Sequence, residues 1–149
     1  MGSGTGPRIE EVLPPEAWQI LASDRGSRLI DVRTLAEWNF VGMPDISALG
    51  QTLICVEWNQ FPGMSRNPRF VEAVAEGCGS EEPSTLLFIC RSGARSLQAA
   101  GAVAAHFEGA GKRVRCLNVA EGFEGDLDQN GHRGQLNGWK HRNLAWRQS

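Results

Sequence analysis

The part of the sequence best suited to chemistry is a cysteine that follows an apolar run. Residues 86–89 read Leu-Leu-Phe-Ile, and Cys90 comes directly after them. An apolar run without alternation is typical of a central parallel strand that is buried on both faces. Ligands of open α/β sheets bind beyond the carboxyl ends of the strands. The sequence therefore predicts that Cys90 lies at the mouth of the sheet, where a thiol could act as a nucleophile.

The residues after Cys90 predict the N-terminus of a helix that is directed at its sulfur. Gly93 permits backbone angles that a side chain would forbid, and its small neighbours allow a tight ring. Arg91 and Arg95 add positive charge. Because helix N-termini and nearby arginines stabilise a thiolate, the cysteine needs no histidine base. We expect the active loop to consist of Cys90, Arg91, Ser92, Gly93, Ala94, Arg95 and Ser96.

The spacing of Cys90 and Arg95 indicates which group this loop could hold. Four residues separate the two. Cysteine phosphatases place one residue more between them, and each residue adds up to ~3.3–3.6 Å of chain. A smaller ring can still enclose a single sulfur atom bound about 2.05 Å from the cysteine sulfur. The spacing therefore favours a persulfide over a phosphoryl group.

The other cysteines and the histidines do not add to this chemistry. Cys55 and Cys116 fall in apolar runs, and Cys78 falls on the apolar face of a helical pattern. We expect all three to be small core residues. None of the three histidines shows a recognisable partnership with Cys90. The cysteines have no paired zinc spacing, and the sequence indicates neither a metal nor a cofactor.

The segments around the loop alternate between short apolar runs and helical patterns. Strands are expected at 29–33, 53–56, 86–89 and 114–119. Such alternation predicts an α/β fold with a parallel sheet that is covered by helices on both faces.

Helix signals lie between these runs. A first helix is expected to open at Pro15, and a short one at Thr34, which forms a capping box with Glu37. A third is expected from Asn67. The long helix after the cysteine loop is expected to bury Leu97, Ala100, Gly101, Ala104 and Phe107.

Length and composition indicate one ordinary globular domain. The chain has 149 residues, 15 Lys+Arg against 17 Asp+Glu, and a formal net charge of -2. This balance gives no reason to expect nucleic acid or a membrane as partner, and no apolar run is long enough to span a bilayer. Sparse cysteines are typical of a reduced, cytoplasmic protein. Residues 1–8 are expected to be a flexible N-terminus or a cloning remnant, and 9–149 one domain.

The chain resembles the single-domain members of the rhodanese family of sulfurtransferases. The run Cys90 to Ser96 is similar to the active loop of that family. Residues 29–33, Leu-Ile-Asp-Val-Arg, with Glu37 and the following tryptophan, resemble its aspartate-valine-arginine strand and glutamate-aromatic pair. Asn118, Val119 and Gly122 resemble the segment after its last strand, where Glu121-Gly122 replaces a Gly-Gly pair.

The resemblance implies a rhodanese-like fold with a five-stranded parallel sheet and a double-displacement reaction. Cys90 would take sulfur from thiosulfate or a similar small anionic donor, and would pass it from a persulfide to cyanide or a thiol acceptor, which could be a protein. Arg91 would attract the donor. Asp31 is expected to pair with Arg95, and Arg33 with Glu37, as supporting ion pairs.

Two other functions stay open at this point. The chain could be a non-catalytic binding module of the same fold, although such a module would have little use for Cys90. It could also be a phosphatase or arsenate reductase of related fold, which the loop spacing disfavours. Residues 57–67 are expected to form a loop at the same edge of the sheet, with a role in acceptor specificity or none. The basic segment 132–149 is expected to pack its tryptophans on the domain.

Overall fold

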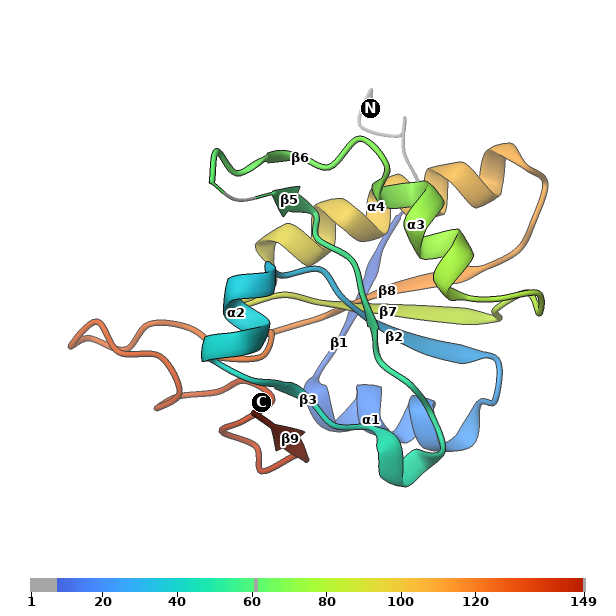
Figure 1. Cartoon of the computed structure of the whole chain (residues 1–149). Helices are drawn as coiled ribbons and strands as arrows, with labels where there is room; N and C mark the ends of the chain where they lie inside the picture. Colours follow the sequence, from blue (N-terminus) through green and yellow to red (C-terminus); the bar gives the residue numbers. More distant parts are fainter. Residues whose placement is uncertain (1–7, 61, 149) are drawn as a thin grey trace.

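Five strands form one central sheet in a computed structural model that describes residues 8–60 and 62–148 (Figure 1). In spatial order they are β1 (Glu10–Val12), β8 (Arg115–Val119), β7 (Thr85–Ile89), β2 (Ser27–Asp31) and β4 (Ile54–Cys55). Each pair of neighbours is parallel. The predicted α/β class and the five-stranded parallel sheet are confirmed.

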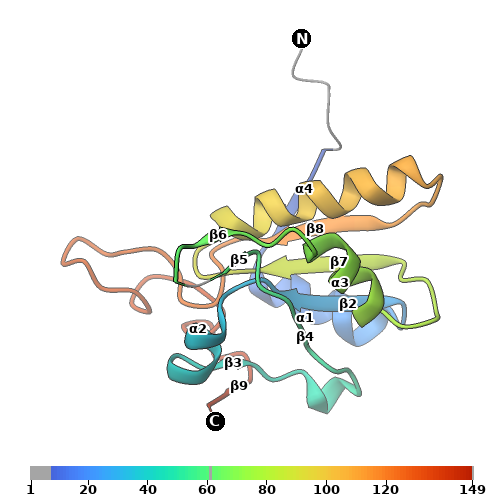
Figure 2. The same cartoon turned by 45° about the horizontal axis from the view of Figure 1, so that its top comes forward.

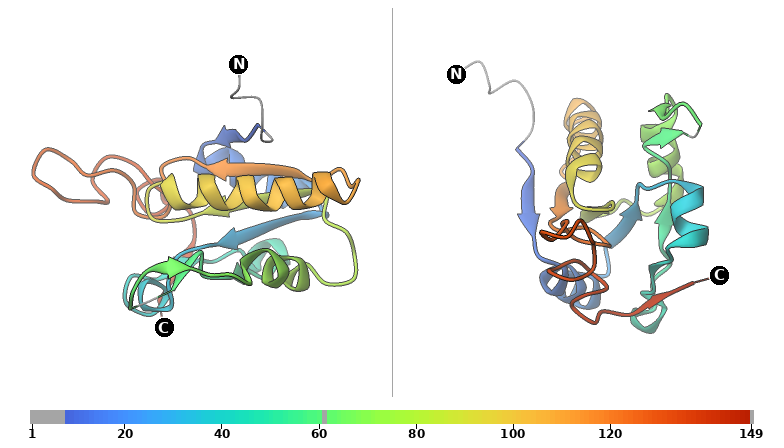
Figure 3. Two further views of the ribbon diagram at one scale, coloured as in Figure 1. Left: turned by 90° about the horizontal axis from the view of Figure 1, so that it is seen from above. Right: turned by 90° about the vertical axis from the view of Figure 1, so that its left-hand side faces the viewer.

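Helices cover both faces of this sheet. Helix α1 (Pro14–Ser23) packs on one face, and α3 (Phe70–Gly77) and α4 (Ala94–Gly109) pack on the other (Figure 3). Because alternate residues of a strand point to opposite faces, the strands feed two separate cores. In β2, Leu29 contributes to the core under α1, and Ile30 to the core under α3 and α4.

Strand β7 explains the uninterrupted apolar run before the cysteine. It lies between β8 and β2, and the side chains of its residues 86–89 are all fully buried. Leu86 and Phe88 belong to the core under α3 and α4, whereas Leu87 and Ile89 belong to the core under α1. The next residue, Cys90, turns again to the side of α3 and α4.

Shorter elements gather where the strands end (Figure 2). They include α2 (Leu35–Phe40) and a hairpin of β5 (Asn59–Gln60) and β6 (Ser65–Arg66). Strand β3 (Met43–Pro44) pairs with β9 (Trp146–Arg147), which fastens the C-terminal segment below α2. A 3₁₀ helix (Ser47–Leu49) precedes β4. The helices of the described residues are too short or too polar to cross a bilayer.

The C-terminal segment packs on the domain as expected. Trp139 is fully buried, and its ring centroid lies 6.0 Å from that of Trp18 on α1. Trp146 is 38% exposed, but its ring packs edge-on against Phe123, and Lys140 lies 4.1 Å from its centroid. The aromatic side chains of this segment and Lys140 therefore pack within the domain.

Two local features differ from the predictions. Strand β1 carries no clear apolar pattern and was not predicted from its residues, because two of its three side chains are exposed. In helix α4, Ala100 and Phe107 are buried as predicted, together with Ser96, Ala99 and Val103. Of the other predicted residues, Leu97 is 43% exposed, and Gly101 and Ala104 are only half-buried. Residues 1–7 of the predicted N-terminal stretch lie outside the described residues.

Candidate active site

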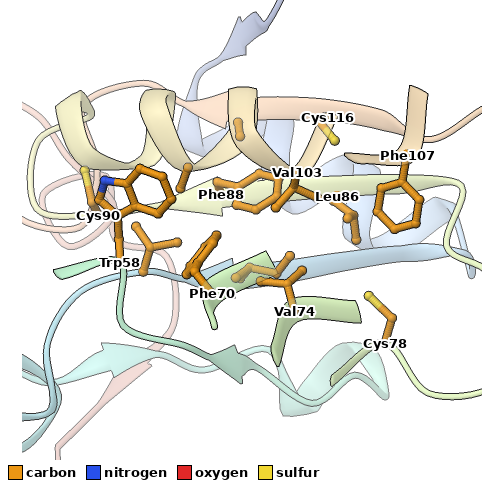
Figure 4. Packing of buried hydrophobic residues seen from close by; sticks show 14 residues of the cluster. Trp58, Phe70, Val74, Cys78, Leu86, Phe88, Cys90, Val103, Phe107 and Cys116 are labelled. Carbon is orange, nitrogen blue, oxygen red and sulfur yellow. The ribbon is translucent and has the colours of Figure 1, made fainter. Parts of the chain in front are cut away.

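Cys90 lies at the carboxyl end of the central strand, as predicted, but it is more enclosed than a residue at an open mouth. Its side chain is only 1% exposed, and it belongs to the core under α3 and α4. Figure 4 shows the indole of Trp58 beside its sulfur. Trp58 follows β4, is 4% exposed, and is held by an edge-on contact with Phe70 and by Arg66, which lies 3.9 Å above its ring centroid.

The sulfur of Cys90 lies at the N-terminus of α4. The backbone N–H of Gly93 donates to Cys90 Sγ at 3.1 Å, and Ser96 Oγ lies 3.2 Å from the same atom. Gly93 is the N-cap of the helix and has a φ of 116°, a value that favours glycine. The structure therefore brings the sequence-predicted loop together around the sulfur, with Arg91 and Ala94 on its exposed side.

The chain after β8 clamps the loop from outside. The N–H of Phe123 donates to the carbonyl of Cys90 at 2.8 Å, and the N–H groups of Glu124 and Gly125 donate to the carbonyl of Arg91 at 3.0 and 3.2 Å. Gly122 has a φ of 68°, and a Cβ there would lie 2.5 Å from the carbonyl carbon and oxygen of Arg91. The clamp therefore requires glycine at 122.

Glu121 has a left-handed backbone conformation next to Gly122. Its φ is 72°, which is unusual for a residue with a side chain. Its carboxylate accepts two hydrogen bonds from Arg142, at 2.7 and 2.6 Å, and one from the N–H of Gly138 at 2.9 Å. The hydrogen bonds from Arg142 hold the pKa of Glu121 below its usual value. This network offsets the backbone strain at 121.

The ion pair of Arg95 differs from the prediction. Arg95 donates to both carboxylate oxygens of Glu37, at 2.8 and 2.9 Å, instead of pairing with Asp31. Burial raises the pKa of Glu37, but the hydrogen bonds and charge of Arg95, with hydrogen bonds from Thr34, outweigh it and lower the pKa. The capping box of Thr34 and Glu37 is confirmed, so one carboxylate joins the start of α2 to the first turn of α4.

Arg33 pairs with Asp31 and not, as predicted, with Glu37. Arg33 donates to both carboxylate oxygens of Asp31, with Nη2 at 2.7 Å, and both side chains are fully buried. The reason is strand geometry: residues two apart on an extended chain share a side. The side chain of Leu29 places that side under α1, whereas Arg95 belongs to α4 on the other face.

The buried Arg33 supports the clamp rather than the sulfur. It donates to the carbonyl of Gly42 at 2.8 Å, and its guanidinium carbon lies 4.4 Å from the ring centroid of Phe123. Phe123 in turn donates its N–H to the carbonyl of Cys90. Asp31, Arg33 and Glu37 therefore form ion pairs beside the loop and its clamp, with partners exchanged relative to the prediction.

The sequence assigned no role to Asn118 or to Glu11, which lie next to Ser96 and Asn118 respectively. Asn118, at the end of β8, is fully buried and lies against Ser96, and Glu11 of β1 accepts a hydrogen bond from its amide at 2.9 Å. Asn118 had appeared only as part of the family resemblance. Asn118 could have been identified from the sequence because it is a polar residue in an otherwise apolar strand. A buried polar group of this kind requires a hydrogen-bond partner.

The remaining cysteines are in less favourable surroundings. Burial raises the pKa of Cys116 to about 12 and raises that of Cys78. Both are core residues, as predicted, whereas Cys55 is exposed. Loss of solvation around the Cys55 thiol and the charge of Asp31 raise its pKa to about 12 as well. Because Ile54 packs towards α3 and α4, Cys55 faces the opposite side of the sheet from Cys90.

The pocket beside α1 and β4 is separate from the cysteine loop. Within residues 8–60 and 62–148, no group of three His, Cys, Asp or Glu side chains could hold a metal ion. A pocket of about 870 Å³ lies by the end of α1 and β4, with Arg28 and Gln51 in its lining. It contains no residue of the cysteine loop and no nucleophilic thiol, so its size does not make it the reactive site.

Comparisons with known proteins agree with this architecture. No family model matches the chain. Uncharacterized protein RP600 from Rickettsia prowazekii is 28% identical over 138 residues, which cover 93% of this chain and 97% of that protein. The crystal structure of Rv0390 from M. tuberculosis is 38% identical, with a TM-score of 0.81, and the match covers 96% of this chain and all of that one. The chain belongs to the same family as Rv0390.

A second solved structure extends the likeness to a protein of named activity. The 30 kDa polysulfide-sulfur transferase homodimer from Wolinella succinogenes matches with a TM-score of 0.57 and 16% identity. The match covers 95% of this chain and 80% of that one. At this identity the likeness concerns the fold alone. The protein, like its relatives of known structure, has a rhodanese-like fold.

Proposed function

We propose that the protein is a sulfurtransferase that carries a sulfane sulfur as a persulfide on Cys90. The observation that carries the proposal is the position of the Cys90 sulfur at the start of α4, where the Gly93 N–H donates to it. The first N–H groups of a helix have no acceptor within the helix. The first turn of α4 therefore offers several donors to a persulfide anion.

The reaction consists of two displacements at sulfur. The Cys90 thiolate attacks the outer sulfur of thiosulfate or a similar donor, the donor S–S bond breaks, and its electron pair leaves with sulfite. Cyanide or a thiolate then attacks the outer sulfur of the Cys90 persulfide. The persulfide S–S bond breaks, and its electron pair returns to Cys90 as thiolate. This sequence is nucleophilic catalysis with ping-pong kinetics.

The two arginines of the loop have different roles in this proposal. Arg91 is exposed at the loop and is free to attract an anionic donor. Arg95 is engaged by both oxygens of Glu37 and maintains the shape of the loop. Its guanidinium is therefore not available to bind an oxyanion, which argues against a phosphatase or arsenate reductase in addition to the short spacing from Cys90.

Other features support an enzyme over a non-catalytic module. The N–H of Gly93 donates to the Cys90 sulfur, and the clamp at 122–125 holds the carbonyls of Cys90 and Arg91. A binding module would not require them. The likeness in fold to a polysulfide-sulfur transferase supports sulfur chemistry, and polysulfide is a further candidate donor. A thiolate carrier of this kind suits a reducing, cytoplasmic setting.

Intact-mass measurement after exposure to thiosulfate tests the proposal. The parent should gain the mass of one sulfur atom and lose it on addition of cyanide, with thiocyanate as product. Cys90→Ser should gain nothing. The parent should also fail to hydrolyse aryl phosphates. A parent that gains no sulfur from thiosulfate or polysulfide, or that hydrolyses aryl phosphates well, would contradict a sulfurtransferase.

A further inference from the structure

A pair of buried polar side chains beside Cys90 has no role in the displacements above. Ser96 and Asn118 are both fully buried. The hydroxyl oxygen of Ser96 lies 3.2 Å from Cys90 Sγ and 3.2 Å from the carbonyl oxygen of Gly93, and its nearest polar neighbour is Asn118 Oδ1. A hydroxyl has a single hydrogen, so Ser96 can donate to only one of these three atoms.

The orientation of the Asn118 amide is set by two acceptors. Its Nδ2 lies 2.9 Å from Glu11 Oε2 and 3.1 Å from the carbonyl oxygen of Gly93. Turning the amide over would place its oxygen against a carboxylate and a carbonyl, neither of which can donate. The amide oxygen therefore faces Ser96.

This orientation decides where the hydroxyl hydrogen of Ser96 points. Among the described residues, Ser96 is the hydrogen-bond donor to Asn118 Oδ1, and a buried acceptor without a donor is unfavourable. Ser96 therefore donates to Asn118. Its oxygen can then accept a hydrogen bond from the Cys90 thiol, but it has no hydrogen left to donate to the Cys90 thiolate.

We propose that Asn118, oriented by Glu11, withholds the hydroxyl hydrogen of Ser96 from Cys90 and thereby keeps the Cys90 thiolate strongly nucleophilic. A thiolate that accepts fewer hydrogen bonds forms less readily but attacks faster, because nucleophilicity rises with basicity. Asn118 is in this sense a positioning residue. The effect of Asn118 on sulfur transfer rests on the proposed function. Its effect on the titration of Cys90 can be measured without assuming that function.

Several charged groups also act on the sulfur and must be held constant. Arg95 of α4 interacts with it electrostatically and is paired with Glu37 of α2. Arg91 follows it in the loop, and Glu11 of β1 acts through Asn118. The buried pair of Asp31 and Arg33 belongs to β2. Asn118→Leu leaves all of these charges in place, and its side chain is close in shape to the original.

The test is the pH titration of the Cys90 thiolate by its ultraviolet absorbance, taken as the difference from Cys90→Ser. The chain has no tyrosine to interfere, and the pKa values of Cys55 and Cys116 are raised to about 12. In Asn118→Leu, the freed hydroxyl donates to the thiolate. The midpoint should move down by roughly one pH unit, the scale of a hydrogen bond to a charged group. The plateau rate of alkylation by iodoacetamide should fall about threefold.

The variant Ser96→Ala tests whether Asn118 acts on Cys90 through the hydroxyl of Ser96. In a Ser96→Ala background there is no hydroxyl to release, so adding Asn118→Leu should leave the midpoint unchanged. An equal shift with and without Ser96 would overturn the proposal, and so would an unshifted midpoint in a folded Asn118→Leu. Neither measurement needs a sulfur donor, so either result stands apart from the fate of the proposed function.

A surface variant keeps the test decisive if Asn118→Leu does not fold. Glu11 is exposed, and in Glu11→Lys the ammonium group cannot accept from Nδ2 and attracts the amide oxygen instead. Glu10→Lys is the matched control, since Glu10 is the neighbouring exposed acid and contacts Arg115. The midpoint should fall further in Glu11→Lys than in Glu10→Lys, and the difference should vanish without Ser96. Equal shifts in the two variants would refute the control by Asn118.

Discussion

Two buried cysteines on neighbouring strands have opposite surroundings. Cys90 follows β7 and is 1% exposed, and Cys116 lies in β8 and is 6% exposed. Both belong to the same core under α3 and α4, and Figure 4 shows them at opposite ends of it. The Cys90 sulfur accepts a backbone hydrogen bond at a helix N-terminus. Cys116 is packed into this apolar core, and burial raises the pKa of its thiol to about 12.

The difference shows that two cysteines buried in one core can have different hydrogen-bonding surroundings. In a parallel sheet followed by helices, the carboxyl end of a strand meets a helix N-terminus, where unpaired N–H groups point inward. The other end offers no such donors. A cysteine at the carboxyl end of the sheet therefore lies beside hydrogen-bond donors, whereas Cys116 at the other end is a small core residue.

Exchanging serine for each cysteine should have the largest effect. Cys90→Ser should abolish sulfur transfer to cyanide and change stability little, because a hydroxyl there can use the Gly93 N–H. Cys116→Ser should retain the activity but lower the free energy of unfolding by about 1–3 kcal/mol, because its hydroxyl is buried among apolar side chains. Thiocyanate production and urea unfolding measure the two effects. Transfer by Cys90→Ser would assign the sulfur to another cysteine.

Substituting one glycine of the clamp should have the next largest effect. In Gly122→Ala the new methyl group meets the Arg91 carbonyl, which positions the loop, and the φ of 68° is strained for alanine. Displacing reactive groups by about 1 Å can lower turnover roughly a hundredfold. We expect a loss of that order in thiocyanate production, together with lower stability.

Gly101→Ala is the matched control for the clamp. A Cβ at Gly101 would have no atom within 4 Å besides those of its own helix. Alanine should therefore stabilise α4 by about 0.5–1 kcal/mol and leave turnover unchanged. If Gly122→Ala is as active as Gly101→Ala, the clamp does not position the loop that distinguishes Cys90 from Cys116.

The sequence predicted the position of Cys90 better than the contacts that surround it. The apolar run before Cys90 and the glycine at 93 were sufficient to place the cysteine at the end of a buried strand beside a helix. These are local signals, because strand burial and helix capping depend on neighbouring residues. The five-stranded sheet followed from resemblance, since β1 has only three residues and one buried side chain.

The ion pairs were predicted with exchanged partners because pairing depends on the face of the sheet on which each side chain lies. The sequence alone does not show which charged residues share a face. Asp31 and Arg33 share the α1 side of the sheet, whereas Arg95 and Glu37 meet between α4 and α2. The clamp joins the segment 122–125 to Cys90 and Arg91 through backbone hydrogen bonds, and the side chains of Glu11 and Asn118 meet although they are 107 residues apart. Charge and spacing do not reveal such contacts.

Removing one arginine at each end of the sheet should have a smaller effect. Arg91→Ala should lower kcat/KM for thiosulfate by up to roughly tenfold, with little change at saturation, because a single exposed charge attracts a doubly charged donor over a few ångströms. Raising the salt concentration should reproduce part of the loss in the parent, since screening acts over ~8–10 Å. Arg113→Ala, which removes an exposed charge near Cys116, should leave kcat/KM unchanged. Equal losses in the two variants would mean that net charge, not the position of Arg91, attracts the donor.

The smallest expected effect concerns the ion pairs at the two ends. The pair of Arg95 and Glu37 is partly buried, with both side chains 19% exposed, whereas Lys112 and Glu82 form a pair that is about half exposed.

Because the pKa of Glu37 is lowered in the folded protein, its contribution to stability is present above the unfolded value of about 4.3 and is lost as the pH falls through the folded value. Glu37→Gln should therefore be less stable than the parent at pH 7, by about 1–2 kcal/mol. The gap should close as the pH falls through the lowered folded pKa of Glu37, because below that pKa both chains carry a neutral side chain at 37. Glu82→Gln should change stability by less than about 0.5 kcal/mol, as is usual for exposed pairs. Urea unfolding followed by tryptophan fluorescence across this pH range measures both. A gap between the parent and Glu37→Gln that stays constant with pH would show that the carboxylate charge of Glu37 does not hold α2 to the start of α4, and that the two ends of the sheet do not differ in this respect.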